Sequence, residues 1–441
     1  SLWLLAAAPL GAEEAYTVYP PEGIQVFLGL DDTSVPTQVQ DGRAQSLQNI
    51  RLDISKSIRK RYGVDRVGDS CDVAQVDWPD VTGLYYTKFS SGTERIIRHC
   101  GTALEYLSGS SWLPVVGTYT AGQNNQFVYT TALDNIVGTN NVDPPFRWTG
   151  GASAISFPMS YPGLSSPITK AVAVVYFKNY LIFGNIEEGG TRYSTCIRWA
   201  PEGDPFAAVT NYDDDNRIDI ASLGGQEIVA FAELYDSLYV FLTDALYKVS
   251  LGGGAETFQI SKVLDDIGSI AKNSIQTLTL ANAKNGLIFL DKDKRVYFFD
   301  GAVAQDLTAL LTVTMQALSG TRLQYAVSAH DATDYYLCVT NGSASANNLC
   351  LNFQYQIGEW SKHTNIPANA MAHVFDSNAT DQIYWGSDHS LVYQLVDTDN
   401  RDDVGSATGT VTATGRNLVS ADPFISDAQV IYVSTAAYTV G

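Results

Sequence analysis

The stretch that decides the fold is Leu238-Tyr239-Val240-Phe241-Leu242-Thr243-Asp244-Ala245-Leu246-Tyr247-Lys248-Val249. Residues 238–242 have the composition of a buried strand, and Thr243-Asp244 are turn residues. Residues 246–249 read as a second strand with an aromatic side chain near its middle. Two apolar strands joined by a short turn are typical of a β-hairpin. The same unit recurs at residues 287–299 and 383–395.

The hairpins belong to a longer repeat. Strongly apolar runs recur at intervals of roughly 45 to 60 residues, which is near the period of propeller blades. Each repeat has room for about four strands, and radial packing of such sheets leaves only short edges. We therefore predict an all-β fold, a β-propeller of six to eight blades with seven as the best value. The runs are residues 84–86, 127–129, 180–183, 238–242, 287–290, 335–339 and 383–385.

Two weaker copies of the hairpin extend the pattern. Residues 84–86 are followed by 103–107 beyond a Ser90-Ser91-Gly92 turn, and 335–339 by 349–353 beyond Asn341-Gly342. A double β-sandwich or a right-handed β-helix could produce the same strands, although a β-helix needs a shorter and more regular period.

The domain organisation follows from where the repeats begin and end. We expect an N-terminal interface segment at 1–66, the propeller at 67–400 and a small C-terminal β extension at 401–441 that is incomplete. The apolar residues 2–10 are interpreted as a buried segment, with a signal remnant as the alternative. The charged stretch 397–403 is a linker, and 408–441 predicts further strands, including 429–433. Continuation beyond Gly441, or pairing with a neighbour, is expected.

Composition and charge narrow the function classes. The 441 residues are 45% hydrophobic but only 17% charged, and the formal net charge is -20. Such a surface disfavours general attraction to nucleic acid or anionic lipid. It remains compatible with a passage through which DNA slides without sticking. No apolar run reaches the length of about 18 residues that crosses a bilayer, so we expect no stable membrane insertion.

One strongly basic run interrupts the acidic sequence. A solvated face is one interpretation of it, and a contact with an acidic neighbouring subunit is the other. Its residues are the candidate subunit or adaptor interface: Arg51, Lys56, Arg59, Lys60, Arg61 and Arg66.

The five cysteines are spread along the chain without a C-x-x-C pair, which argues against a disulfide framework or structural zinc. We expect reduced, buried cysteines. A cross-strand pair between Cys338 and Cys350 is the alternative, because they lie on successive predicted strands.

The sequence lacks the common motifs for catalysis, nucleotide binding and metal binding. The five histidines show no paired ligand spacing, and no G-x-S-x-G, Walker A or G-x-G-x-x-G motif occurs. We therefore predict no enzyme activity, no metal and no cofactor. Trp148, Trp199, Trp360 and Trp385 could stack on sugars but are interpreted as blade core.

Clusters of aspartates are the remaining candidates. Asp291 and Asp293 are interpreted as turn residues, because Asp is favoured in turns for its backbone hydrogen bonds. Two further clusters receive the same structural interpretation and, as a hypothesis, form acidic loops that face a channel: Asp213, Asp214 and Asp215, and Asp265 and Asp266.

Several segments resemble one family. Residues 35–51 followed by 58–63 look like the start of the tail nozzle proteins of short-tailed bacteriophages, also called tail tubular protein B or packaged-DNA stabilisation proteins. Residues 140–148 resemble their P-P-x-R-W blade. The strand 179–184 with the segment 192–206 resembles their S-x-x-G-D-P region. The resemblance covers roughly residues 35 to 400.

The resemblance implies a structural virion component, located in the tail and assembled in the host cytoplasm. Such a protein forms a homo-oligomeric ring, expected to be hexameric, below the portal and its adaptor protein. The ring continues the DNA channel, helps to retain and eject the genome without binding it specifically, and carries tail fibres or a tip needle.

Two other function classes stay open. A secreted or surface propeller that binds or hydrolyses carbohydrate would need an acid pair about 5 to 9 Å apart in a central pocket. A host-cell scaffold of the WD or kelch type would need repeat signatures that the sequence lacks.

Overall fold

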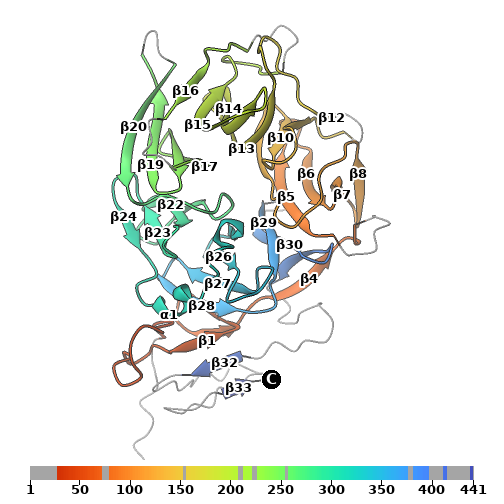
Figure 1. Cartoon of the computed structure of the whole chain (residues 1–441). Coiled ribbons are helices and arrows are strands. Elements are labelled where there is room, and N and C mark those ends of the chain that lie inside the picture. The colour runs from red at the N-terminus through yellow and green to blue at the C-terminus, as the bar shows by residue number, and fades with distance from the viewer. Residues whose placement is uncertain are drawn as a thin grey trace, which may run out of the picture.

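Seven sheets, each built on four antiparallel strands, surround a common axis in the computed structural model (Figure 1). The structure describes residues 27–71, 79–151, 155–206, 212–220, 226–253, 257–375 and 381–396, and the strands at 411–414 and 438–440. Within six of the sheets the four blade strands follow one another in chain order from the axis outward, and in the seventh the outermost strand comes from the N-terminal segment. This is the arrangement of a β-propeller. The predicted all-β propeller is thus confirmed, with seven blades.

The first three blades occupy residues 81–219 of the chain. Blade one consists of β5 (Val81–Lys88), β6 (Glu94–Cys100), β7 (Ala103–Ser108) and β8 (Ser111–Val115). Blade two consists of β9 (Val128–Ala132), β10 (Asn135–Thr139), β11 (Phe146–Trp148) and β12 (Ile155–Ser156). Blade three consists of β13 (Ile168–Phe177), β14 (Tyr180–Glu188), β15 (Thr191–Trp199) and β16 (Arg217–Asp219).

The remaining blades continue around the axis. Blade four consists of β17 (Ile228–Leu234), β18 (Ser237–Leu242), β19 (Ala245–Leu251) and β20 (Phe258–Asp265). Blade five consists of β21 (Gln276–Thr279), β22 (Asn285–Leu290), β23 (Val296–Phe299) and β24 (Ala304–Asp306). Blade six consists of β25 (Val327–His330), β26 (Asp334–Val339), β27 (Leu349–Gln354) and β28 (Glu359–His363). Blade seven begins with β29 (Ala368–Phe375), β30 (Asp381–Ser387) and β31 (Val392–Val396).

The predicted hairpins are confirmed except for one. Central pairs join Val240 to Tyr247, Phe289 to Tyr297 and Trp385 to Tyr393, and β26 pairs with β27 as expected. The pairing of 84–86 with 103–107 is wrong, because β6 lies between β5 and β7 and pairs with both. The sequence Glu94–Cys100 mixes charged and apolar residues, so it lacked the uniformly apolar signal of the other strands.

A strand from the N-terminal segment closes the ring. The fourth strand of blade seven is β4 (Gly63–Val67), which pairs antiparallel with β31 through Val392 and Val67. This pairing joins blade seven to the segment that leads directly into blade one, so it closes the ring of blades. The predicted boundary between residues 66 and 67 therefore falls inside a strand that completes the propeller.

The rest of the N-terminal segment packs beside blade six (Figure 1). β1 (Ser46–Gln48) pairs in parallel with β28, and β2 (Ile50–Leu52) forms a small hairpin with β3 (Ile58–Lys60). The far edge of β1 pairs with β32 (Val411–Thr414), which pairs with β33 (Tyr438–Val440). Residues 2–10, 397–403 and 429–433, on which sequence predictions were made, lie outside the described residues.

Two short helices follow blade five, α1 (Thr312–Gln316) and the 3-10 turn η1 (Leu323–Tyr325). Asp32 of the N-terminal segment accepts hydrogen bonds from the backbone N–H groups of Val313 and Thr314, at 3.1 and 3.0 Å. This carboxylate satisfies donors that the first turn of a helix leaves unpaired. The N-terminal segment is thereby attached to blade five as well as blade six.

The core lies between neighbouring blades. The four tryptophans discussed above are all buried, with exposed fractions of 0 to 5%, so their interpretation as core is confirmed: Trp148, Trp199, Trp360 and Trp385. Blades approach closely where a side chain is absent, because a Cβ on Gly184 would lie 2.5 Å from the Phe231 ring of the next blade. Burial of each large apolar side chain stabilises such an interface by roughly 1.5–3 kcal/mol.

The expectation that all cysteines are reduced is wrong. Cys71 and Cys100 form a disulfide, with Cα atoms 6.3 Å apart. Cys71 follows β4 and Cys100 ends β6, so ring closure brings them together. Cys338 and Cys350 are paired in register but are free thiols, with Sγ atoms 2.7 Å apart. The sequence alone could not reveal the first pair, since its proximity arises from tertiary closure.

Candidate functional site

The two least exposed arginines of the basic run, Arg51 and Arg61, make contacts that stabilise the fold. Arg51 pairs with Asp334 at 3.0 Å and stacks over the Tyr62 ring, 4.1 Å from its centre. Burial acts to lower the pKa of Arg51, but Asp334, together with Tyr336 and Tyr62, outweighs it and raises that pKa. Arg61 is buried and donates to the Asn49 side chain at 3.2 Å. Arg51 therefore ties the N-terminal segment to blade six, and Arg61 positions Asn49, which exchanges hydrogen bonds with Thr364 after β28.

The exposed part of the run lies around the β2–β3 hairpin and in β4. The Arg59 side chain is 65% exposed and pairs with Asp53 at 2.9 Å. Hydrogen bonds from Ser55 and Ser57 outweigh burial and lower the pKa of Asp53 to about 2. Lys56 and Lys60 are partly exposed, and Arg66 is exposed and donates to the Gly68 carbonyl. A basic surface remains here, carried by Arg59, Lys60 and Arg66.

The predicted acidic loops are exposed turns beside outermost strands. Asp213, Asp214 and Asp215 directly precede β16, and the Asp214 carboxylate accepts a hydrogen bond from the Ser165 N–H at 3.0 Å. Hydrogen bonds from Ser165 lower the pKa of Asp214. Asp265 ends β20 and pairs with Lys262. These contacts agree with the structural interpretation of Asp in turns.

The exposed basic and acidic groups lie on opposite sides of the molecule. β16 and β20 belong to blades three and four, whereas β4 completes blade seven and β1 to β3 adjoin blade six. In Figure 1 the first pair is at the upper and left rim, and β1 and β4 are at the bottom. The acidic rim formed by Asp213, Asp214, Asp215 and Asp265 therefore lies on a different side of the propeller from the basic rim formed by Arg59, Lys60 and Arg66. Two cations, Arg217 and Lys262, stand beside the acids of the acidic rim.

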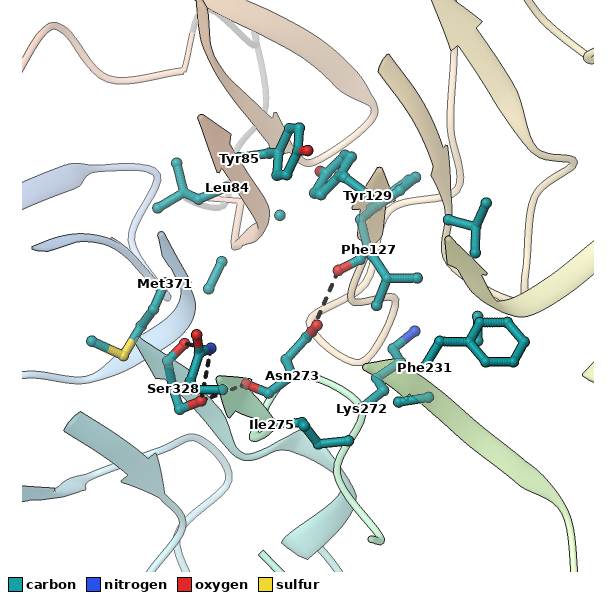
Figure 2. Close-up of a pocket in the computed structure, with 17 residues that line it drawn as sticks. Leu84, Tyr85, Phe127, Tyr129, Phe231, Lys272, Asn273, Ile275, Ser328 and Met371 are labelled. Atoms are coloured by element: carbon teal, nitrogen blue, oxygen red, sulfur yellow. Dashed lines mark hydrogen bonds between the residues drawn. The ribbon is translucent and has the colours of Figure 1, made fainter. Parts of the chain in front are cut away.

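A cavity of about 220 Å³ lies at the axis, and all seven blades contribute to its wall. Figure 2 shows Tyr85, Phe127, Tyr129 and Phe231 around it. Tyr85 and Tyr129 are stacked with ring centres 5.3 Å apart. No Asp or Glu is among the described residues of the wall. The acid pair that carbohydrate hydrolysis requires is therefore not formed by these residues.

Lys272 supplies the charge in this cavity. It precedes β21, and its Nζ donates to the Gln126 carbonyl oxygen of the segment before β9 at 2.6 Å. Burial lowers the pKa of Lys272 to about 7. Sequence reasoning missed this residue, because a single lysine in a connection between strands matches no motif.

A polar network joins the blades at the end of the cavity where the innermost strands begin. Gln126 donates to the carbonyls of Tyr325 and Asn369, both at 3.0 Å, and its own Oε1 is buried without a partner. Asn369 donates to Gln123, and Asn347 donates to Tyr325 and to blade seven. Together with Lys272, these bonds connect blades five, six, seven, one and two.

A second pocket, of about 440 Å³, lies between blades six and seven. Arg51, Tyr62, Asp331 and Asp381 line it. Burial, with Asp334 adding to it, raises the pKa of Asp331 to about 6. Asp381 lies 2.5 Å from His373.

The described residues contain neither a metal-binding group nor a membrane-crossing helix. No three or more of their His, Cys, Asp and Glu side chains are grouped to hold a metal ion. No helix among them has the length and apolar character needed to cross a membrane.

Comparisons with known proteins find only distant likenesses in shape. No family model and no curated protein matches it. It is similar to the structure described as YCF48 bound to D1 peptide, with 8% identity and a TM-score of 0.42 over 77% of this chain and 96% of that one. It is also similar to the computationally designed Ika8 protein, with 11% identity and a TM-score of 0.42 over 75% and 100%.

A third similar structure is virginiamycin B lyase from Staphylococcus aureus, with 10% identity and a TM-score of 0.47 over 76% of this chain and 99% of that one. Likenesses this distant indicate nothing about what the chain does.

Proposed function

We propose that this protein is a structural component of a bacteriophage tail, a nozzle subunit that assembles into a homo-oligomeric ring. The observation that carries the proposal is the separation of exposed charge, with Asp213–Asp215 and Asp265 on one rim and Arg59 and Lys60 on the other. The sequence resemblance to tail nozzle proteins supports the same role.

Opposite charges on opposite rims suit a head-to-tail contact. In this contact the acidic turns face a neighbouring copy rather than the channel that the sequence analysis expected them to face. When the basic rim of one copy meets the acidic rim of the next, the interface is heterologous, and such interfaces generate rings when the rotation closes. Complementary charge steers the encounter and fixes the register. We expect six copies, as the resemblance implies.

The overall charge suits a wall for a DNA channel. At a net charge of -20 the surface repels phosphate groups at short range, so DNA would pass without specific binding. The portal adaptor above and the tail fibres or tip below are the partners that this role requires.

Charge reversal at the basic rim tests ring formation. Arg59→Glu with Lys60→Glu should leave the fold intact, because exposed ion pairs contribute only about 0–1 kcal/mol. Arg61 is excluded because it is buried. Mass photometry of the full chain should show rings for the natural protein and monomers for the variant. Lys88→Glu with Lys284→Glu is the matched control, since those lysines are 51% and 49% exposed and each pairs with an acid.

A reciprocal change identifies the partner surface. Asp215→Lys with Asp266→Lys should also abolish rings, and mixing the two variants should restore assembly of alternating copies. Rings that survive both reversals would contradict the proposed contact.

Immunogold electron microscopy tests the location of the protein. An antibody to this chain should label one vertex of virus particles from its source, near the tail. Label confined to cells or to free protein would contradict the tail role even if rings form, and a glycan-binding screen would then follow.

A further inference from the structure

Two thiols face each other inside blade six. Cys338 lies on β26 and Cys350 on β27, and the antiparallel register places them directly opposite each other. Their Sγ atoms are 2.7 Å apart, and both side chains are fully buried. Opposed residues of an antiparallel pair have Cα atoms about 4.5 or 5.5 Å apart. Both separations fall within the range of roughly 4.4–6.8 Å seen in disulfides, so the register alone permits a bond between the two sulfurs.

The hairpin holds the two sulfurs in this position. The pairing of β26 with β27 runs along both strands without a register shift. Beyond the strands, the Thr340 hydroxyl donates to the side-chain oxygen of Asn347 at 2.8 Å. The backbone N–H of Asn341 donates to the side-chain oxygen of Asn348 at 2.7 Å. Reacting groups that are held together combine much faster than the same groups free in solution. The folded hairpin therefore preorganises the two thiols for bond formation.

The two cysteine pairs lie on opposite flanks of blade seven. The disulfide between Cys71 and Cys100 lies where blade seven meets blade one. Cys338 and Cys350 belong to blade six and pack in one apolar cluster with Trp385 of blade seven. Blade seven is the blade that β4 completes from the start of the chain. A bond between the second pair would strengthen the surface on which the other flank of this closing blade packs.

We propose that Cys338 and Cys350 are a second disulfide-forming pair, reduced in this structure and oxidised by a small disulfide such as oxidised glutathione. One cysteine thiolate attacks the small disulfide, so that a mixed disulfide forms and one glutathione leaves as a thiol. The other cysteine attacks the mixed disulfide and releases the second glutathione. The two electrons and the two thiol protons thus pass to glutathione. The inference does not rest on the tail role, because both cysteines lie in the core of one chain.

Burial determines when the bond can form. The thiolate is the reactive form of cysteine, and burial raises the pKa of the Cys338 thiol. Apolar side chains of blades six and seven cover both sulfurs. We therefore expect oxidation during folding, before these two blades pack together, and much slower oxidation of the folded chain.

Refolding in a glutathione redox buffer tests the inference. The full chain is unfolded, refolded in a mixture of reduced and oxidised glutathione, denatured again and alkylated. The tryptic fragment 323–362 contains both cysteines and no other cysteine. Mass spectrometry should show this fragment without alkyl groups and lighter by two hydrogen atoms than its dithiol form. Protein refolded with reduced glutathione alone is the reference, in which both cysteines should be alkylated. Alkylation of both cysteines, or glutathione bound to each, after refolding in the redox buffer would overturn the proposal.

Single substitutions identify the partners of the bond. In Cys350→Ala the remaining Cys338 has no partner, so it should end with a bound glutathione or an alkyl group. Cys196 is the matched control, because it is also a buried free thiol but lies opposite Asp219 in the sheet. Cys196→Ala should leave the bond in fragment 323–362 intact, and loss of the bond in that variant would overturn the assignment. If Cys350→Ala fails to fold, the mass of fragment 323–362 from the natural protein still decides the question.

Discussion

The seam where blade seven meets blade one and the cavity at the axis each contain a cation, but the cation is fully buried and paired in the seam and half-buried without a carboxylate in the cavity. In the seam, Arg98 is fully buried and pairs with Glu105 at 2.7 Å. Its other contacts are the Asp69 carbonyl at 3.0 Å and the Trp112 ring, 4.3 Å away. In the cavity, Lys272 has a single carbonyl.

This difference indicates which cation has a structural role and which is a candidate for a functional role. A buried cation that is paired and hydrogen-bonded belongs to the architecture, because its desolvation is offset where it lies. A buried cation that lacks a carboxylate lowers stability, and such groups cluster at functional sites. The comparison predicts that perturbing the seam destabilises the fold, whereas neutralising Lys272 stabilises it.

The largest effect should come from breaking the seam pair. Glu105→Leu leaves Arg98 charged and buried, which should lower the free energy of unfolding by about 3–5 kcal/mol. Urea denaturation monitored by tryptophan fluorescence measures this. The double variant Arg98→Met with Glu105→Leu should recover most of the loss, because apolar replacement of a buried pair is often neutral. A loss below about 1 kcal/mol in the single variant would mean that water already solvates Arg98.

Removing the disulfide beside this pair should have the next largest effect. Cys71 and Cys100 are 29 residues apart in sequence, and the backbone N–H of Cys71 donates to the same Ser390 carbonyl that Arg98 approaches. Cross-linking a loop of that size stabilises by about 3.5 kcal/mol through the unfolded state. Cys71→Ser with Cys100→Ser should lower stability by that order in urea. Reducing agent should lower the stability of the natural protein by a similar amount, whereas the stability of the serine variant should not change.

The seam also shows what the sequence could and could not predict. Apolar runs such as 238–242 set strand positions and the number of blades, because strand period and turn chemistry are local. The closing strand β4 was assigned outside the propeller, since its pairing with β31 links residues more than 300 apart. The disulfide arises from the same closure.

The candidate sites were predicted only in part. The basic run was found from charge alone, but charge does not reveal burial, and Arg51 and Arg61 turned out to hold the N-terminal segment in place. Lys272 was missed because its significance comes from seven blades meeting at the axis. No spacing pattern along the chain indicates which residues lie together at the axis.

The smallest of these effects concerns Lys272 and depends on pH. The unfolded ammonium titrates near 10.4, and burial lowers the pKa of the folded form to about 7. Between these values the unfolded chain binds more protons, so the stability of the natural protein should rise with pH by about 0.6 kcal/mol per unit, a value discounted for the partly exposed side chain.

Lys272→Met lacks this dependence, because the variant has no proton to bind. It should therefore exceed the natural protein in stability by about 2 kcal/mol at pH 6, with the gap closing as the pH rises from 7 toward 10. Urea denaturation at pH 6, 8 and 9.5, with Lys88→Met as the exposed control, measures the gap. A gap that does not change with pH would mean that Lys272 keeps its charge with an adequate partner in the cavity. The contrast between Lys272 and Arg98 would then fail.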